Sequence, residues 1–129
     1  MAEVNVGEIV KAHARSGTYV GKVIEDRGDR YLIEILAVLK HPLQGDLHNL
    51  NKLEDVFFHE RKALAHHEKT NIKKAAVHLY DEKVPEYIPS LKESVQIYRE
   101  KLEQETSAYN VQALRTLNKL EDEVYRKLY

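Results

Sequence analysis

The stretch SGTYVGKVIED, residues 16–26, holds two of the chain's five glycines and decides how the first half of the sequence folds. A phosphate-binding loop needs glycines between a buried strand and a helix whose free N–H groups hold the anion. The residues after Gly21 instead alternate and are rich in β-branched side chains, which is typical of a strand. We therefore predict that Gly21 makes room where strands cross closely, and that Gly17 supplies a positive φ in the preceding turn.

The strand-like pattern continues on both sides of this stretch. Arg27-Gly28-Asp29 is a hairpin-type turn, and β-branched and aromatic residues dominate the run that follows it. The expected strands cover residues 7–13, 18–26, 30–40, 56–59, 63–66 and part of 73–80. Short strands joined by tight turns, without helical crossovers, predict a small and strongly bent antiparallel barrel.

After residue 80 the apolar period becomes helical. One stripe consists of Ile88, Leu91, Val95, Tyr98 and Leu102, and a second of Val111, Leu114, Leu117, Leu120, Val124 and Leu128. The phase breaks at residues 106–110, which include good N-cap residues, so two antiparallel helices are favoured over one rod. Ser90 and Glu93 match a capping box. The predicted fold is mainly β plus α, with a barrel over residues 1–80 and a helical hairpin over 81–129, packed as a single compact unit.

Composition limits the function classes. The 129 residues suit one domain, and the absence of cysteine excludes disulfides, thiolate metal sites and cysteine nucleophiles. The 20 Lys and Arg balance 21 Asp and Glu, whereas nucleic-acid-binding proteins usually carry a basic excess. No apolar run is long enough for a membrane helix, and the N-terminus lacks the pattern of a signal peptide. We expect a soluble, cytoplasmic protein that does not bind nucleic acid.

The seven histidines raise the question of a metal or phosphotransfer site. Four of them lie near two glutamates, in the set His59, Glu60, His66, His67, Glu68 and His78. Adjacent residues on a strand point to opposite faces, so His66 and His67 cannot aim at one ion there. The predicted helices contain no histidine, which argues against a phosphotransfer bundle. No catalytic motif is present either, so we predict no metal, no cofactor and no catalytic residue.

Tyrosine is unevenly placed, since six of eight tyrosines follow residue 79. Tyrosine is enriched at protein interfaces because it buries a large area and keeps a polar tip. One interpretation is that these rings seal the hairpin onto the barrel, and Tyr98 fits it because it lies in the first stripe. The other is a partner surface, which we predict at Tyr87, Tyr109, Tyr125 and Tyr129.

Several stretches carry a family resemblance over most of the chain. They are VGEIVKAH at 6–13, SGTYVGKVIED at 16–26, RYLIEILAVLKHPLQGDLHN at 30–49, FFHERKALAHHEKTN at 57–71 and VPEYIPSLKESV at 84–95. Together they resemble the kinase-associated protein B family of spore-forming Gram-positive bacteria. The resemblance implies an SH3-like barrel followed by helices. It also implies an accessory protein that supports a membrane sensor histidine kinase feeding the sporulation phosphorelay.

The sequence departs from the family's pattern in one respect. The family name describes a lipoprotein, and lipidation needs a cysteine that this sequence lacks. We therefore expect no direct membrane anchor and contact with the membrane only through the partner. Two alternatives stay open, namely a regulatory or structural subunit of another assembly, homodimeric through the hairpin, and a weak nucleic-acid-binding barrel.

Overall fold

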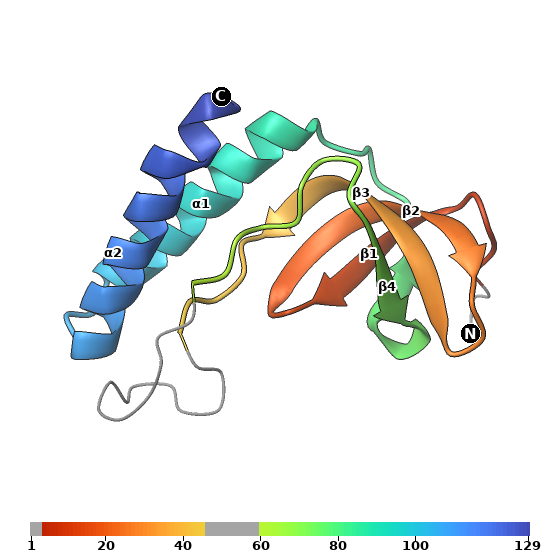
Figure 1. The fold of residues 1–129 in the computed structure, drawn as a ribbon, viewed down its shortest axis with the longest axis horizontal. Coiled ribbons are helices and arrows are strands. Elements are labelled where there is room, and N and C mark those ends of the chain that lie inside the picture. The colour runs from red at the N-terminus through yellow and green to blue at the C-terminus, as the bar shows by residue number, and fades with distance from the viewer. Residues whose placement is uncertain (1–3, 46–59) are drawn as a thin grey trace.

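A computed structural model describes residues 4–45 and 60–129, as an antiparallel sheet followed by two helices (Figure 1). The strands are β1 (Ile9–Ala14), β2 (Gly17–Asp26), β3 (Arg30–Lys40), β4 (Lys69–Lys73) and β5 (Val77–Leu79). The helices are α1 (Tyr87–Glu103) and α2 (Ala108–Glu123), with 3-10 turns η1 (Lys74–Ala76) and η2 (Tyr125–Lys127). The strand order is β4-β3-β2-β1-β5, and the sheet curls into an open barrel. The predicted class, mainly β plus α with a barrel-like sheet, is confirmed.

Gly21 lies where β2 and β3 approach closely. The pairing of these strands shifts register beside it, between Val20 and Gly21. A Cβ at this position would overlap the side chain of Ile33 and lie 2.8 Å from the backbone oxygen of Glu34. Only glycine fits so close to another backbone. The predicted role of Gly21 is confirmed.

The prediction for Gly17 is wrong. The turn before β2 places Arg15 and Ser16 in the left-handed region, with φ of 48° and 66°, whereas Gly17 is the first residue of the strand. A Cβ on Gly17 would lie 2.7 Å from the Tyr19 hydroxyl. Residues two apart share a face of a strand, so glycine here makes room for the Tyr19 ring.

The strands after residue 60 differ from the prediction. The predicted strand at 63–66 is absent. The backbone groups of Ala63 and Leu64 bond to tyrosine hydroxyls, and those of Ala65 bond to Glu68, so no ladder forms there. The fourth strand, β4, forms later, at 69–73. Within the range 73–80 only Val77–Leu79 is strand, preceded by η1. The strand predicted at 56–59 lies outside the described residues.

The break between the two helices is confirmed, and the predicted capping box is not. Ser107 is the N-cap of α2, where its Oγ accepts a hydrogen bond from the Asn110 N–H. Ser90 lies inside α1, which begins at Tyr87, and its Oγ donates to the Tyr87 carbonyl while accepting from the Val38 N–H. Ser90 therefore joins α1 to the end of β3 instead of capping the helix.

The two predicted apolar stripes differ in how far they are buried. In the first, Leu91, Val95, Tyr98 and Leu102 are buried. In the second, Leu117 and Leu120 are buried, but Val111 and Leu128 are 40% and 49% exposed. The buried face of α2 also uses Ala113 and Thr116, so it is rotated from the purely apolar stripe.

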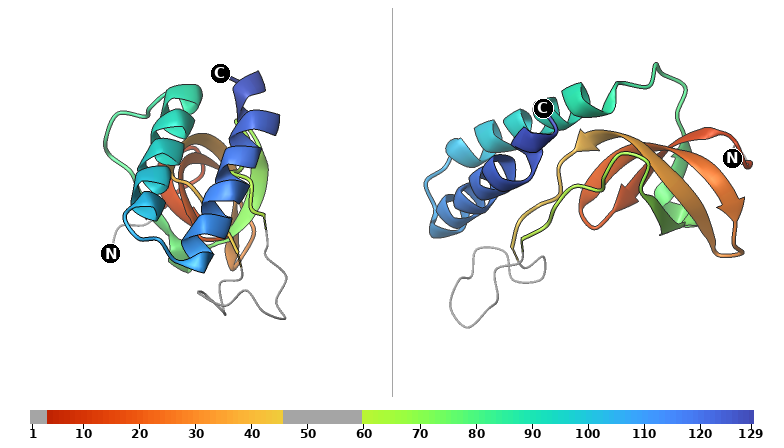
Figure 2. Two further views of the ribbon diagram at one scale, coloured as in Figure 1. Left: turned by 90° about the vertical axis from the view of Figure 1, so that its left-hand side faces the viewer. Right: turned by 45° about the horizontal axis from the view of Figure 1, so that its top comes forward.

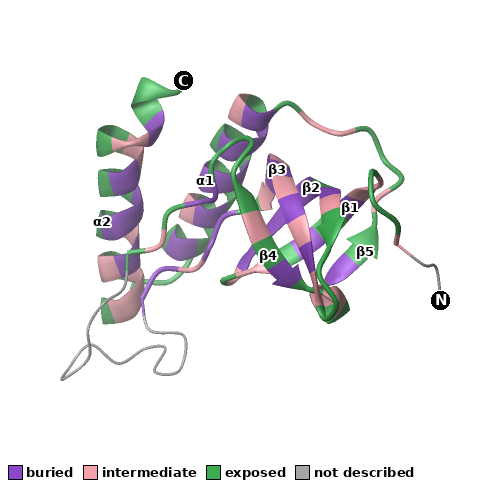
Figure 3. Ribbon diagram, turned by 45° about the vertical axis from the view of Figure 1, so that its right-hand side comes forward, coloured by how far each residue is buried: buried purple, intermediate pink, exposed green. Residues whose placement is uncertain are grey.

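The helices lie side by side at one end of the elongated molecule, and the barrel forms the other end (Figures 1 and 2). Two extended segments, residues 41–45 and 60–65, project from the barrel and run alongside the helices. The buried faces of the helices turn toward these segments and β3 (Figure 3). A division at residue 80 and cooperative folding as one unit stay predictions.

Candidate interaction surface

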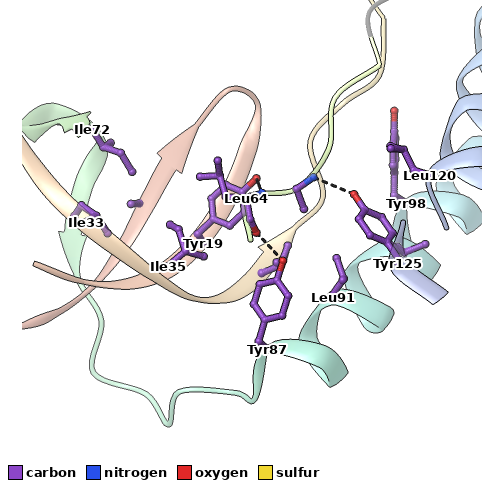
Figure 4. Close-up of a cluster of buried hydrophobic side chains, with 14 of the residues drawn as sticks. Tyr19, Ile33, Ile35, Leu64, Ile72, Tyr87, Leu91, Tyr98, Leu120 and Tyr125 are labelled. Carbon is purple, nitrogen blue, oxygen red and sulfur yellow. Dashed lines mark hydrogen bonds between the residues drawn. The ribbon is translucent and has the colours of Figure 1, made fainter. Parts of the chain in front are cut away.

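Three C-terminal tyrosines hold the helices onto the two extended segments, and Figure 4 shows two of them, Tyr87 and Tyr125. The Tyr87 hydroxyl donates to the Leu64 carbonyl at 2.6 Å, and the Ala63 N–H donates to the Tyr125 hydroxyl at 2.9 Å. The Tyr109 hydroxyl donates to the Gln44 carbonyl. Each ring thus ties a helical residue to the backbone of a segment that belongs to no strand. We name Tyr87, Tyr109 and Tyr125 the tyrosine clamp.

His41 completes the clamp from the barrel side. Its Nδ1 lies 2.9 Å from the Pro42 carbonyl, and its Nε2 lies 2.7 Å from the Tyr125 hydroxyl. A carbonyl can only accept, so Nδ1 carries the proton and the Tyr125 hydroxyl donates to Nε2. His41 is 1% exposed, and burial lowers its pKa to about 4. The imidazole is therefore neutral at neutral pH, as this bonding requires.

Gln44 joins the two extended segments to each other. Its side-chain Nε2 donates to the Arg61 carbonyl at 2.8 Å, and its Oε1 accepts from the Arg61 N–H at 2.9 Å. Its own N–H donates to the Tyr98 hydroxyl at 2.8 Å. The Gln44 side-chain amide is fully buried and pairs with Arg61 as a backbone peptide group would. It therefore holds the two extended segments together without a strand ladder. Neither His41 nor Gln44 was predicted as part of the site, since neither stands in a motif.

The structure corrects the predicted partner surface. Tyr87 and Tyr125 are 5% and 1% exposed, so they cannot face a partner, and they seal the hairpin onto the barrel instead. Tyr109 is half-buried in the clamp. Tyr129 is exposed, with the Lys92 ammonium 4.6 Å from its ring centroid and the Glu121 carboxylate 3.3 Å from its hydroxyl. Partner contact through Tyr109 and Tyr129 stays a prediction.

Two hollows follow the line where α1 meets the barrel. The larger, about 460 Å³, is lined by Leu36 of β3, His66, and the segment 84–89 that enters α1. The smaller, about 160 Å³, lies further along α1 and is lined by Leu39, Leu43 and Ile97, among others. We name the two hollows together the junction surface.

The side chains of the junction surface are suited to contact with another protein. Ile97 is 56% exposed, and a solvent-facing large aliphatic side chain beside an apolar hollow is typical of a contact site. Lys40 and Lys101 also line the smaller hollow, without a carboxylate among its lining residues. Such a surface fits an apolar side chain with an acidic neighbour.

The histidines lie differently from the sequence expectation. His66 and His67 are in a turn, with φ of 68° at His67. Their rings therefore stack, with centroids 3.7 Å apart, rather than facing opposite sides. His66 also stacks on the Tyr87 ring at 5.1 Å, and His67 Nδ1 lies 2.6 Å from a Glu34 oxygen. Within residues 4–45 and 60–129, no three histidines, aspartates or glutamates come together as a metal site would require. His59 lies outside the described residues.

The helices of the described chain are too short or too polar to span a bilayer.

Fold and surface together define a class, namely small β-plus-α proteins with an open barrel-like sheet, a clamped helical hairpin and apolar hollows at their junction. The family model described as "Kinase associated protein B" matches residues 14–125. The chain belongs to the kinase-associated protein B family.

Two known proteins show the same relationship. The chain is 41% identical to the kinase-associated lipoprotein B of Bacillus subtilis strain 168 over 127 residues, covering 98% of this chain and 99% of the relative. The crystal structure of kinase-associated protein B from Bacillus cereus superposes with a TM-score of 0.80 at 32% identity. That superposition covers 94% of this chain and 97% of the other. The relatives are named for association with a kinase rather than as kinases.

Proposed function

We propose that this chain is a non-catalytic accessory protein that binds a membrane sensor histidine kinase and supports its activation in the sporulation phosphorelay. The observation that carries the proposal is the 41% identity to kinase-associated lipoprotein B along nearly the full length of both chains. The protein acts in the cytoplasm and reaches the membrane through its partner.

The contacts of the described residues support a binding role. The most deeply buried ionisable groups, such as His41 and Tyr125, make hydrogen bonds that hold the helices in place. A catalytic acid or base would instead lie at a cleft with a bond left for substrate. The junction surface offers exposed aliphatic and basic side chains on a backbone fixed by the clamp, which suits recognition of another protein.

The test is recovery of the kinase together with rescue of sporulation. A tagged copy is expressed in Bacillus subtilis that lacks its own kinase-associated lipoprotein B, and detergent-solubilised membranes are used for pull-down. We expect a sensor histidine kinase to be recovered and the sporulation frequency to rise toward wild type. Ile97→Glu should weaken both, while the matched control Val111→Glu, an exposed aliphatic residue on α2, should not.

Other results would contradict the proposal. Recovery of an unrelated enzyme with no kinase would favour a subunit of another assembly. A dimer in sedimentation that dissociates with Ile97→Glu, again without kinase, would assign the junction surface to self-association. Rescue of sporulation without detectable kinase contact would show that the chain supports sporulation by a route other than binding the kinase.

A further inference from the structure

The barrel is not closed by a backbone ladder between β4 and β1, although the two strands approach each other. In the described part of the chain β4 is an outer strand of the sheet, paired with β3 on one side. The ladder is flanked by two backbone bonds, from the Lys74 N–H to the Asp29 carbonyl and from the Ile35 N–H to the Glu68 carbonyl. In an antiparallel pair the residues bonded to the neighbour alternate. The backbone N–H and C=O groups of the even-numbered residues of β4 therefore bond to β3, and those of Lys69, Asn71 and Lys73 point away from it.

A hollow lies on this open side. It measures about 310 Å³ and is lined by the end of β1 (13–14), Arg15 and residues 70–73 of β4, among others. Arg30 and Lys73, which are paired across β3 and β4, also line it. We name this hollow, with the outward edge of β4, the seam.

The seam concentrates positive charge in a protein whose net charge is −1. Arg15, Arg30 and Lys73 line the hollow, and its lining includes no aspartate or glutamate. The only ion pair recorded for these three in the described residues is the one from Arg30 to Asp29, at 3.7 Å. Arg15 also lines the neighbouring hollow around Arg61, which contains Glu60 and Glu68, whereas Arg30 and Lys73 line only the seam among these two hollows.

We propose that the seam binds an extended acidic segment of a partner protein, which adds to the sheet as a strand along β4. Strand addition supplies N–H and C=O groups to an open sheet edge, while side chains at alternate positions supply selectivity. Lys69 and Lys73 are exposed on one face of β4, so carboxylates at alternate positions of the added strand would lie beside them.

Two features favour a peptide over nucleic acid. A sugar-phosphate backbone cannot continue a ladder of N–H and C=O groups, which β4 presents. Single-stranded nucleic acid is usually bound along basic grooves in which aromatic rings stack on the bases. The hollow is lined by no tyrosine or phenylalanine. The inference rests on the proposed function only in taking the partner to be a protein.

The test uses purified full-length protein and a capped peptide of alternating glutamate and valine that is long enough to span β4. Amide NMR should show binding, with the largest shifts at Lys69, Asn71 and Lys73, and calorimetry gives the affinity. A second peptide, N-methylated at alternate residues, has the same charge but lacks the donors for the ladder. We expect it to bind about tenfold more weakly or not at all.

Charge-reversal variants separate the seam from general electrostatics. R15E/K73E should lower the peptide affinity by about tenfold or more. The matched control R115E/K127E changes the same residue types on the exposed helical end and should leave the affinity unchanged. Circular dichroism checks that both variants fold. If R15E/K73E does not fold, the single variant Lys73→Gln should still show a measurable loss.

Three results would overturn the inference. Equal binding of the methylated and unmethylated peptides would reduce the seam to a charged patch without strand addition. Tighter binding of a thymidine oligonucleotide than of the peptide would reassign it to nucleic acid. No binding at low salt would leave the lysines of β4 only as protection against edge pairing. Kinase recovery by R15E/K73E at wild-type level would place kinase binding elsewhere, and the proposed function would stand.

Discussion

The two ends of the molecule share one apolar core but differ in the buried polar bonds that are added to it. The barrel interior is packed hydrocarbon, with Val20, Val23, Ile33 and Ile35 fully buried, and depends on how closely β2 and β3 approach. The helical end shares that apolar core through residues such as Leu91 and Leu117, and it adds a buried network of hydroxyl, imidazole and amide groups along the extended segments. Hydrocarbon packing is sensitive to volume, whereas a buried polar network is sensitive to lost partners and to protonation.

The largest effect should come from Gly21→Val in the barrel. A side chain here must displace the backbone at Glu34, so overpacking should lower the free energy of unfolding by about 3 kcal/mol. Urea unfolding followed by circular dichroism measures the change. The neighbouring Lys22→Val adds the same side chain at an exposed position and should change stability little. Equal stability of Gly21→Val and wild type would show that the strands do not need this close approach.

The second effect belongs to the clamp and depends on pH. Burial lowers the pKa of His41 to about 4, from an ordinary value of 6.5. The unfolded chain therefore binds more protons at this site between those pH values, and stability falls as pH drops through that window. The loss between pH 7 and pH 5 should be about 2 kcal/mol, and the contribution of this site levels off as the pH falls below 4.

His41→Asn isolates this contribution from the other titrating groups. The variant should be less stable at pH 7 and lose less stability than wild type between pH 7 and pH 5. In NMR of the folded protein, the His41 ring should keep its neutral shifts down to pH 5. A ring that titrates near 6.5 in the folded state would mean that it is not enclosed as the structure shows.

A smaller effect is expected when only the clamp hydroxyl is removed. Tyr125→Phe keeps the ring but leaves His41 Nε2 and the Ala63 N–H without their partner. Stranding buried polar groups should cost about 1.5 kcal/mol. Tyr129→Phe is the matched control, because its hydroxyl meets Glu121 at an exposed site. If both variants lose the same stability, the clamp does not fix the helices through this bond.

The contrast between the two ends also explains what sequence could predict. Strand alternation and the helical stripe of α1 depend on local periodicity, so the class and the break at Ser107 were predictable. The clamp was not, because Tyr125 and His41 meet across 84 positions of the chain. A tyrosine that binds a backbone group deep inside has the same local sequence as one that faces a partner. The seam was equally hidden, since Arg15 and Lys73 are brought together only by the curl of the sheet.

The smallest effect should be purely local to the helical end. Ser107 Oγ accepts the Asn110 N–H at 3.0 Å, which satisfies one donor in the first turn of α2. Ser107→Ala removes that acceptor without changing a clamp residue, so the free energy of unfolding should fall by about 1 kcal/mol. Ser107→Asp keeps an acceptor at the cap and should stay close to wild type. Because the cap and the Tyr125 hydroxyl share no partner, the losses of Ser107→Ala and Tyr125→Phe should add. A double variant that loses clearly less than the sum would show that α2 unfolds from its cap once the clamp is weakened, and that the two contacts are not independent.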